Sequence, residues 1–184
     1  VQTRTLTTID KTRSADEVVL GGSAVQSLRG ENQAGEVAAR LTDAARILLA
    51  ADSLGAAQTM IGKAVAYADE RQQFNRLIGS FQAVKHLCAE MAARLEPCRA
   101  LIWYAAYAHD QKLDDARLMS LLAKSHISEV GQFVARTATE VHGGMGFTDL
   151  LGLHYWFKRI GANRQLLGGP ERLRAEAATL QGWA

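Results

Sequence analysis

Proline is scarce in this chain of 184 residues, which contains only Pro97 and Pro170. Because proline ends or kinks helices, its scarcity favours long helices. Cysteine is equally scarce, and Cys88 and Cys98 cannot form a disulfide framework. Both are predicted to be reduced core residues of a cytoplasmic protein. No apolar run approaches the roughly 20 residues of a membrane span, so no membrane association is expected.

An excess of charge of either sign is also missing. Lys and Arg number 21 against 19 Asp and Glu, which gives a net charge of +2. This balance gives no electrostatic support for binding to nucleic acid or to an anionic membrane. Hydrophobic residues make up 48% of the sequence and charged residues 22%, a globular composition that excludes wholesale disorder.

The first 35 residues differ in character from the rest. Val1–Ile9 is rich in β-branched residues and predicts a strand, and Glu17–Leu20 predicts a second strand after a turn at residues 10–14. Two strands alone are marginally stable in water, so we expect them to complete a sheet whose other strands lie outside this sequence. The alternative is that they pair with another subunit. The predicted domains are therefore residues 1–35, the end of a β-domain, and residues 36–184.

Helical periodicity begins at about Glu36. The spacing of apolar residues predicts long helices from there to about residue 68, from Ser80 as N-cap to about residue 109, and over residues 116–141. Shorter helices are predicted over residues 150–166 and after Pro170. On the first helix, the core face is assigned to Val37, Leu41, Leu48, Leu54, Ile61 and Val65. The predicted fold is mainly α, an up-and-down helical bundle with a short N-terminal β segment.

Metal chemistry finds no support in the sequence. No Glu-x-x-His occurs, so the di-iron pattern of helical bundles is missing, and the Cys and His spacings fit no zinc site. No metal ligand is therefore assigned.

Two other stretches are more informative. Gly143, Gly144 and Gly146 follow a predicted helix, where a cap needs only one glycine, so either a simple cap or the approach of a ligand to the backbone explains them. Between the first two long helices, Arg71 offers a guanidinium fork suited to phosphate, beside Phe74 and Gln82. A solvated loop with aromatic anchors is the alternative interpretation of that segment.

Together these stretches resemble the acyl-CoA dehydrogenase family. The segment from Tyr67 to His86 resembles the start of its C-terminal helical domain, Glu140–Thr148 resembles its glycine motif, and Leu153–Arg159 resembles the segment that follows. The likeness runs from about Val1 to Gly169. It implies that residues 1–35 end the family's middle β-domain, and that the protein is FAD-dependent and oxidises the Cα–Cβ bond of an acyl-CoA thioester. It also implies a homo- or hetero-oligomer, with the FAD held between subunits.

The resemblance also implies cofactor-binding residues. Arg71 would meet the FAD pyrophosphate of a neighbouring subunit, and the adenosine and phosphate portion would lie along the glycine motif. The implied set comprises Arg71, Gln73, Phe74, Gln82, Glu140, Val141, His142, Gly143 and Gly144. Glu140 stands where many relatives have Gln, and Asn75 where the family usually has Gly.

The family's catalytic base is missing from both of its usual positions. Leu167 and Ala45 occupy them, and neither carries a titratable group, so no catalytic residue is assigned. The first hypothesis is therefore a base-less subunit of a mixed acyl-CoA dehydrogenase. The second is a self-sufficient enzyme whose base is Asp43, Glu171 or a residue outside this sequence. The third is a helical interaction module without flavin.

Overall fold

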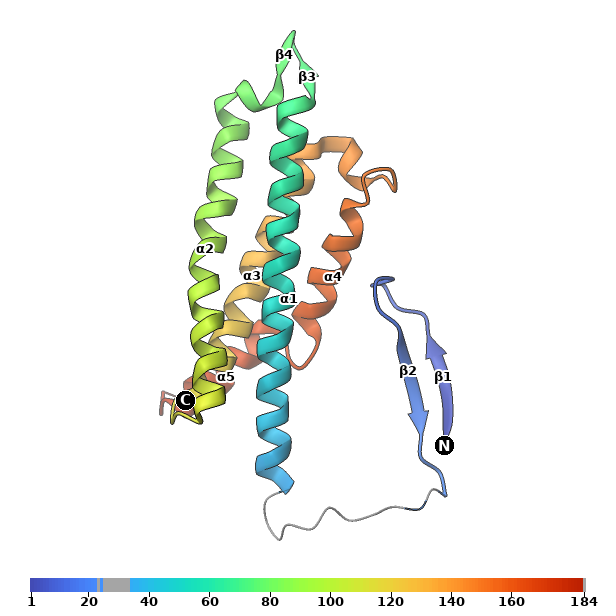
Figure 1. The fold of residues 1–184 in the computed structure, drawn as a ribbon, viewed down its shortest axis with the longest axis vertical. Helices are drawn as coiled ribbons and strands as arrows, with labels where there is room; N and C mark the ends of the chain where they lie inside the picture. The colour runs from blue at the N-terminus through green and yellow to red at the C-terminus, as the bar shows by residue number, and fades with distance from the viewer. Residues whose placement is uncertain (23, 25–33, 184) are drawn as a thin grey trace.

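An antiparallel helical bundle dominates the computed structural model, which describes residues 1–22, 24 and 34–183. Its helices are α1 (Ala34–Glu70), α2 (Gln82–Gln111), α3 (Ala116–His142), α4 (Leu153–Gln165) and α5 (Pro170–Leu180). Helices α1 to α4 run alternately up and down, and α5 lies across the lower end of α3 (Figure 1). The predicted mainly-α bundle is confirmed, and the helix boundaries fall within a few residues of those predicted.

The core face of α1 differs from the prediction. Leu54 and Ile61 are buried as expected, whereas Val37, Leu41, Leu48 and Val65 are exposed. The buried row follows Ile47 and contains many alanines: Ala50, Ala57, Ala64 and Ala68. Leu48 lies about 100° around the helix from this row. The prediction followed the larger side chains, while small alanines on the true core face let α3 pack closely against α1.

The start of α2 also corrects the prediction. Ser80 is not the N-cap; it belongs to a 3₁₀ turn (Ile78–Ser80), and its hydroxyl donates a hydrogen bond to the carbonyl oxygen of Leu77 at 2.7 Å. The N-cap position is Phe81, which makes no side-chain capping bond. Further along α2, Met91, Leu95 and Ile102 are buried. Of the two cysteines predicted to be core residues, Cys98 is buried but Cys88 is only partly buried.

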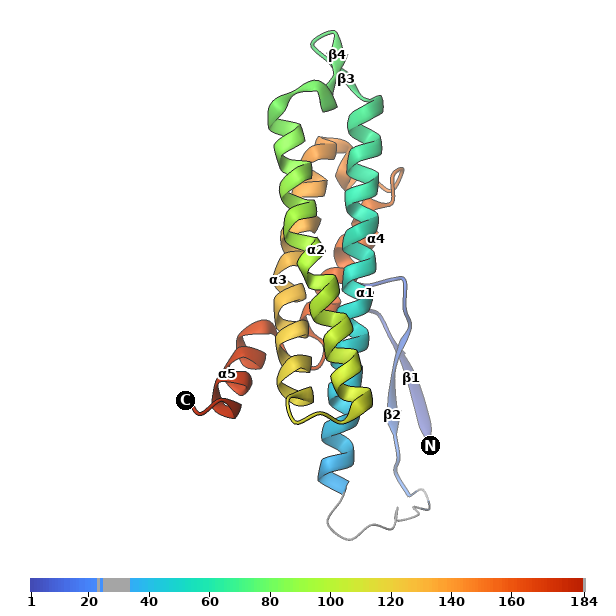
Figure 2. The same cartoon turned by 60° about the vertical axis from the view of Figure 1, so that its left-hand side comes forward.

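The N-terminal strands β1 (Gln2–Leu6) and β2 (Ala15–Val19) form an antiparallel hairpin with Gln2 opposite Val19. Every residue of both strands is exposed, and the hairpin lies beside the bundle (Figure 2). Whether these strands belong to a larger sheet stays a prediction, based on the marginal stability of two isolated strands in water. The predicted domain boundary at residues 35 and 36 lies inside the first turn of α1, and the linker before it (25–33) lies outside the described residues.

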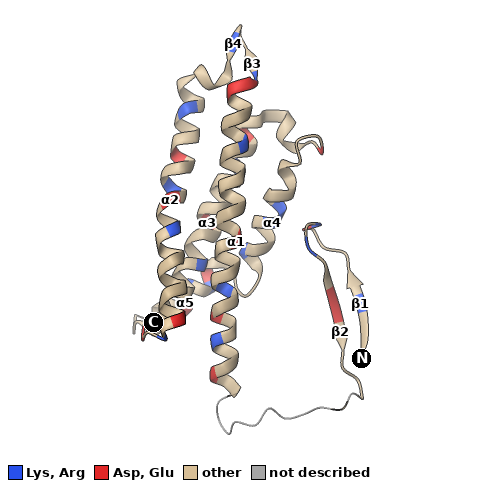
Figure 3. Ribbon diagram, viewed as in Figure 1, with Lys and Arg blue, Asp and Glu red and all other residues tan. Residues whose placement is uncertain are grey.

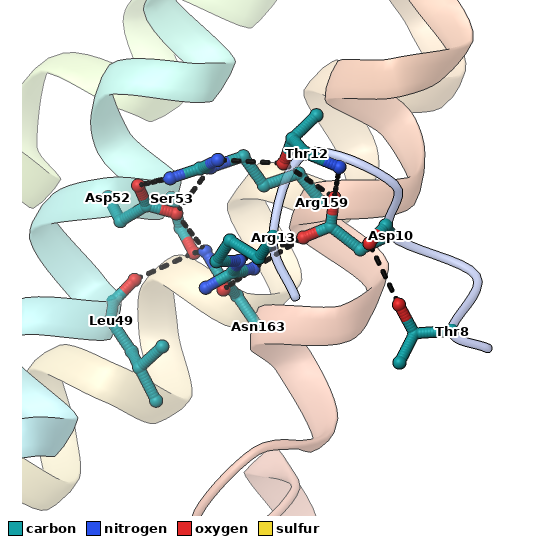
Figure 4. Close-up of polar contacts among 9 residues, drawn as sticks. All are labelled: Thr8, Asp10, Thr12, Arg13, Leu49, Asp52, Ser53, Arg159 and Asn163. Carbon is teal, nitrogen blue, oxygen red and sulfur yellow. Dashed lines mark hydrogen bonds and ion pairs between the residues drawn. The ribbon is translucent and has the colours of Figure 1, made fainter. Parts of the chain in front are cut away.

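A polar network fastens the hairpin turn to the bundle (Figure 4). Arg13 pairs with the buried Asp10 and also donates to Asn163 Oδ1 at 2.7 Å. Asn163, which is fully buried, donates to Asp52 of α1 at 2.6 Å. Arg159 also pairs with Asp52, at 2.6 Å, and reaches Thr12 Oγ1 at 2.8 Å. These bonds join the turn to α1 and α4 at once.

Positive and negative side chains are interspersed along the helices (Figure 3). This distribution agrees with the small net charge. None of the helices in the described part of the chain combines the length and apolar character needed to cross a bilayer.

Candidate functional site

Two turns lie together at one end of the bundle (Figure 1). The first follows α1 and consists of a small hairpin, β3 (Gln72–Gln73) and β4 (Arg76–Leu77), and the 3₁₀ turn Ile78–Ser80. The second is the 3₁₀ turn Gly143–Phe147 after α3. Because α1 and α3 run in the same direction, their C-terminal ends meet at this end. We call the two turns the arginine loop (residues 71–82) and the glycine turn (residues 143–147).

An aromatic stack joins the two turns. Tyr67, in the last turn of α1, stacks on His142, the last residue of α3, with ring centroids 4.7 Å apart and an interplanar angle of 24°. His142 is 5% exposed, and its Nδ1 lies 2.7 Å from the carbonyl oxygen of Ala138. In the sequence, Tyr67 marks only the start of the segment that resembles the family, and no local spacing indicates a stack on a residue 75 positions later.

The arginine loop presents its functional groups to solvent. Arg71, Gln73, Phe74 and Gln82 are exposed, and Phe74 is 87% exposed at the tip of the small hairpin. Phe74 and Asn75 both have positive φ, 53° and 60°. A bulky residue held in the left-handed region is strained, and strain of this kind gathers at functional turns. Among the described residues Arg71 has no ion-pair partner, so its guanidinium is available to an anion.

The glycine turn offers open backbone. A Cβ placed on Gly144 would meet nothing within 4 Å, whereas one on Gly146 would lie 2.9 Å from the carbonyl oxygen of Thr139. Gly143 has φ +58°, a conformation that favours glycine. Packing therefore explains Gly146 and backbone conformation explains Gly143. The space beside Gly144 is open, and neither packing nor a positive φ accounts for this glycine.

The remaining residues of the implied cofactor set divide by exposure. Glu140 is exposed one turn before the glycine turn. Val141 and His142 are 7% and 5% exposed, with their side chains inside the bundle. Any contact these two make with a ligand would be through the backbone.

The two positions of the family's base lie near the opposite end of the bundle. Leu167, between α4 and α5, has φ +57°, and its carbonyl oxygen accepts a hydrogen bond from Arg46 Nε at 3.2 Å. Arg46 adjoins Ala45, so α1 and the α4–α5 turn bring both positions into one region. No role was predicted for Arg46, although its spacing of three residues from Asp43 is typical of a helical ion pair.

The two carboxylates considered as alternative bases, Asp43 and Glu171, both form ion pairs with arginines of the chain. Asp43 is 4% exposed and pairs with Arg46 at 3.2 Å and Arg117 at 3.8 Å. Glu171 pairs with Arg164 at 2.7 Å. A hydrogen bond with its own backbone and the Arg164 guanidinium hold the pKa of Glu171 below its ordinary value of 4.5. A carboxylate with a lowered pKa is a weak proton acceptor.

The length of α1 separates the base positions from the arginine loop. The 25 residue steps from Ala45 to Glu70 correspond to about 38 Å of helix at 1.5 Å per residue. One dinucleotide does not span that distance. A flavin that reacts beside Ala45 or Leu167 of one chain therefore cannot reach Arg71 of the same chain.

A groove of about 1310 Å³ lies between the turn of the N-terminal hairpin, α3 and α4. Its lining combines the apolar Phe133, Phe157 and Ile9 with the basic Arg136 and Lys158. None of the nine residues implied to bind the cofactor lines it. The groove and the two turns are therefore separate features, and periodicity in the sequence gave no signal for the groove.

The described residues contain no group of three or more His, Cys, Asp or Glu side chains arranged to hold a metal ion. Burial raises the pKa of the Cys98 thiol to about 11, so this thiol is unreactive at neutral pH. The features that remain are those of a helical domain with an exposed arginine and an open glycine turn at one end.

Comparison with known proteins identifies this class. The sequence model of the family described as "Acyl-CoA dehydrogenase, C-terminal domain" matches residues 34–179. The chain therefore belongs to the acyl-CoA dehydrogenase family.

Acyl-CoA dehydrogenase IpdE2 of Mycolicibacterium smegmatis is 34% identical over 168 residues, which cover 91% of this chain and 49% of IpdE2. Acyl-CoA dehydrogenase FadE34 of Mycobacterium tuberculosis is 37% identical over 144 residues, 77% of this chain and 20% of FadE34. The chain thus spans about half the length of IpdE2 and less of FadE34.

Solved structures agree on the fold. A glutaryl-coenzyme A dehydrogenase in complex with glutaryl-CoA superposes with a TM-score of 0.90 at 24% identity, covering 100% of this chain and 48% of that one. A variant of the Tcur3481–Tcur3483 steroid ACAD superposes with a TM-score of 0.73 at 31% identity, covering 76% of this chain and 38% of that one. The first likeness extends over the N-terminal hairpin as well as the bundle.

Proposed function

We propose that the full-length protein is a base-less subunit of a mixed, FAD-dependent acyl-CoA dehydrogenase, and that residues 1–35 end its middle β-domain. The observation that carries this proposal is the pairing of the arginine loop with the glycine turn at one exposed end of the bundle, with Ala45 and Leu167 far away. The chain would use this end to complete the flavin site of a neighbouring subunit, and that subunit would supply the catalytic carboxylate.

The exposed residues fit a dinucleotide. The Arg71 guanidinium would neutralise the pyrophosphate, for which its planar fork is well matched. Phe74 would lie along the flavin, and the Gln82 amide would donate and accept hydrogen bonds beside it. Open backbone at Gly144 would let the adenosine portion approach without steric conflict. When bound, FAD would accept the hydride that leaves the Cβ of the acyl-CoA thioester.

One comparison supports both a mixed assembly and a bulky substrate. The relative Tcur3481–Tcur3483 is named by two components and as a steroid ACAD. A steroid-type CoA thioester is therefore the substrate class to test first, beside short and long straight-chain acyl-CoAs. The ion pairs of Asp43 and Glu171 argue against a self-sufficient enzyme that uses either carboxylate as its base.

The test uses the full-length protein, purified alone and with candidate partner subunits. We expect a flavin absorption spectrum and acyl-CoA turnover only with a partner. Turnover by the protein alone would support the self-sufficient enzyme instead, and absence of flavin in every preparation would support the helical interaction module. In the productive complex, Arg71→Ala is expected to weaken FAD binding about ten- to a hundredfold, the contribution of a charged hydrogen-bonded pair. Arg99→Ala on α2, which pairs with Glu96 away from both turns, is the matched control.

A further inference from the structure

The position of the His142 side chain does not match the role that the family resemblance implies for this residue. The resemblance places it among residues that line the cofactor, yet its side chain is buried and stacked on Tyr67. We infer that Tyr67 and His142 form a positioning pair that holds the arginine loop and the glycine turn at a fixed separation. This inference rests on the proposed function, because the separation matters only if both turns hold one ligand.

The pair is fixed on the side of the arginine loop. The carbonyl oxygen of Tyr67 accepts a hydrogen bond from the backbone N–H of Arg71 at 2.9 Å. The carbonyl oxygen of Arg71 in turn accepts one from the N–H of Ile78 at 2.8 Å. The backbone of Tyr67 therefore leads directly into the arginine loop, and its ring adds a contact with α3 at this end of the bundle.

The pair is also fixed on the side of the glycine turn. A carbonyl oxygen can only accept, so the 2.7 Å contact with Ala138 means that His142 Nδ1 carries the proton and donates it. This bond fixes the plane of the imidazole ring against α3. A Cβ on Gly146 would lie 3.1 Å from His142 Cβ, so the glycine turn packs directly against this residue. Gly143 follows His142 without a break.

A stack of two rings thus bridges two segments 75 positions apart, from residue 67 to residue 142. Backbone hydrogen bonds within each turn cannot set the distance between the turns. That distance decides whether Arg71 and the Gly144 backbone can contact one dinucleotide at the same time, and preorganised contacts of this kind spare the cost of ordering on binding.

The experiment measures the dissociation constant for FAD in the full-length protein, assembled with whatever subunit its flavin binding requires. The variants are His142→Ala, which removes the ring, and His142→Phe, which keeps a stacking ring but loses the Nδ1 bond. Tyr67→Leu removes the stack from the other side. His126→Ala, at an exposed histidine on the same helix, is the matched control. Thermal unfolding of each apoprotein is measured in parallel.

We expect His142→Ala and Tyr67→Leu each to weaken FAD binding about tenfold, near the upper end for an aromatic pair. His142→Phe should recover most of the affinity, and the double variant should lose little more than either single one. Normal FAD affinity in both His142→Ala and Tyr67→Leu overturns the inference while leaving the proposed function in place. If His142→Ala fails to fold while Tyr67→Leu binds FAD normally, the pair contributes to folding alone, and the inference is overturned as well. A wild-type assembly that binds no FAD refutes the proposed function itself.

Discussion

Arg46 and Leu167 are joined by a hydrogen bond across 121 positions of sequence, from Nε to the carbonyl oxygen at 3.2 Å. The same guanidinium pairs with Asp43 and with Glu176, each at 3.2 Å. One buried arginine therefore connects α1, α5 and the turn that carries the usual base position. This network keeps Leu167 in its left-handed conformation without any carboxylate at that position.

Replacement of Arg46 by methionine should destabilise the chain. It would leave Asp43 buried with only the more distant Arg117, and removal of one partner of a buried ion pair costs about 3 kcal/mol or more. Urea unfolding measures the change. The double variant Arg46→Met/Asp43→Leu should recover much of the loss, because it removes the orphaned charge as well. Arg99→Met, at a surface pair, should change stability by less than about 1 kcal/mol, and an equal loss in both arginine variants would refute the role given to Arg46.

Asp52 holds the N-terminal hairpin turn indirectly, because it bonds to Arg159 and Asn163, the α4 residues that contact the turn. Burial raises its pKa, but hydrogen bonds from Arg159 and Asn163 and the charge of Arg159 outweigh that effect, so the net pKa is below 3.8. Because the folded pKa is lowered, this contribution to stability is present above pH 3.8 and is lost as the pH falls through the folded value.

Asp52→Asn should therefore release the hairpin turn at neutral pH. The neutral amide loses its charge-assisted bonds to Arg159, and about 2 kcal/mol of stability should go with them. Limited proteolysis and hydrogen exchange at residues 8–13 measure the release. The turn should open in the wild type as well when the pH falls well below 3.8. Asp114→Asn, at an exposed acid, is the control, and equal protection of the turn in the two variants would contradict this prediction.

Periodicity and turn chemistry in the sequence were sufficient to predict the helices and the N-terminal strands. Gly143, Gly144 and Gly146 predicted the end of one helix, since glycine suits the conformations found at helix ends, and the polar stretch before Ser80 predicted the end of another. The core face of α1 was mispredicted because hydrophobicity ranks Leu48 above Ala50, while packing against α3 rewards the smaller side chain. The hydrophobic periodicity of a single helix does not indicate how closely a second helix packs against it.

The candidate site was predictable only in part. Exposed groups such as Arg71 and Phe74 stand out by residue type. The stack between Tyr67 and His142 and the bond from Arg46 to Leu167 join residues far apart in the chain, and no local spacing encodes either contact. The distance between the two base positions and the arginine loop likewise follows only from the direction and length of α1.

Lys124 has no exposed surface, and among the described residues its ammonium donates only to Ser128 Oγ at 3.2 Å and to the carbonyl oxygen of Arg164 at 3.4 Å. Burial, with Arg46 and Arg164 nearby, lowers its pKa from 10.5 to about 8. The unfolded chain therefore binds the proton more tightly, and stability should rise as the pH increases from about 8 to 10.5.

Lys124→Met should stabilise the chain at pH 7 by about 1–3 kcal/mol, because an apolar side chain of similar length avoids the cost of burying a charge. Urea unfolding between pH 7 and 10.5 measures both effects. The variant should lose the part of the pH dependence that Lys124 contributes. A wild-type stability that falls steadily over this range, in parallel with the variant, would show that Lys124 does not titrate as described.

Gly144 and Gly146 are two residues apart and should respond oppositely to alanine. A Cβ on Gly146 would lie 2.9 Å from the carbonyl oxygen of Thr139, whereas one on Gly144 meets nothing within 4 Å. Gly146→Ala should therefore lower the unfolding free energy by about 1–3 kcal/mol through overpacking. Gly144→Ala should leave the unfolding free energy within about 0.5 kcal/mol of the wild type.

In the flavin-binding assembly, Gly144→Ala should have the larger effect, and this effect should be on FAD affinity. Gly144→Ala places a methyl group where the dinucleotide is proposed to approach, so FAD affinity should fall about tenfold or more, while the free chain unfolds as the wild type does. Equilibrium unfolding of the apoprotein and flavin fluorescence titration of the assembly separate the two effects. If Gly144→Ala binds FAD normally, the open space beside this glycine belongs to solvent, and the glycine turn is a helix cap and nothing more.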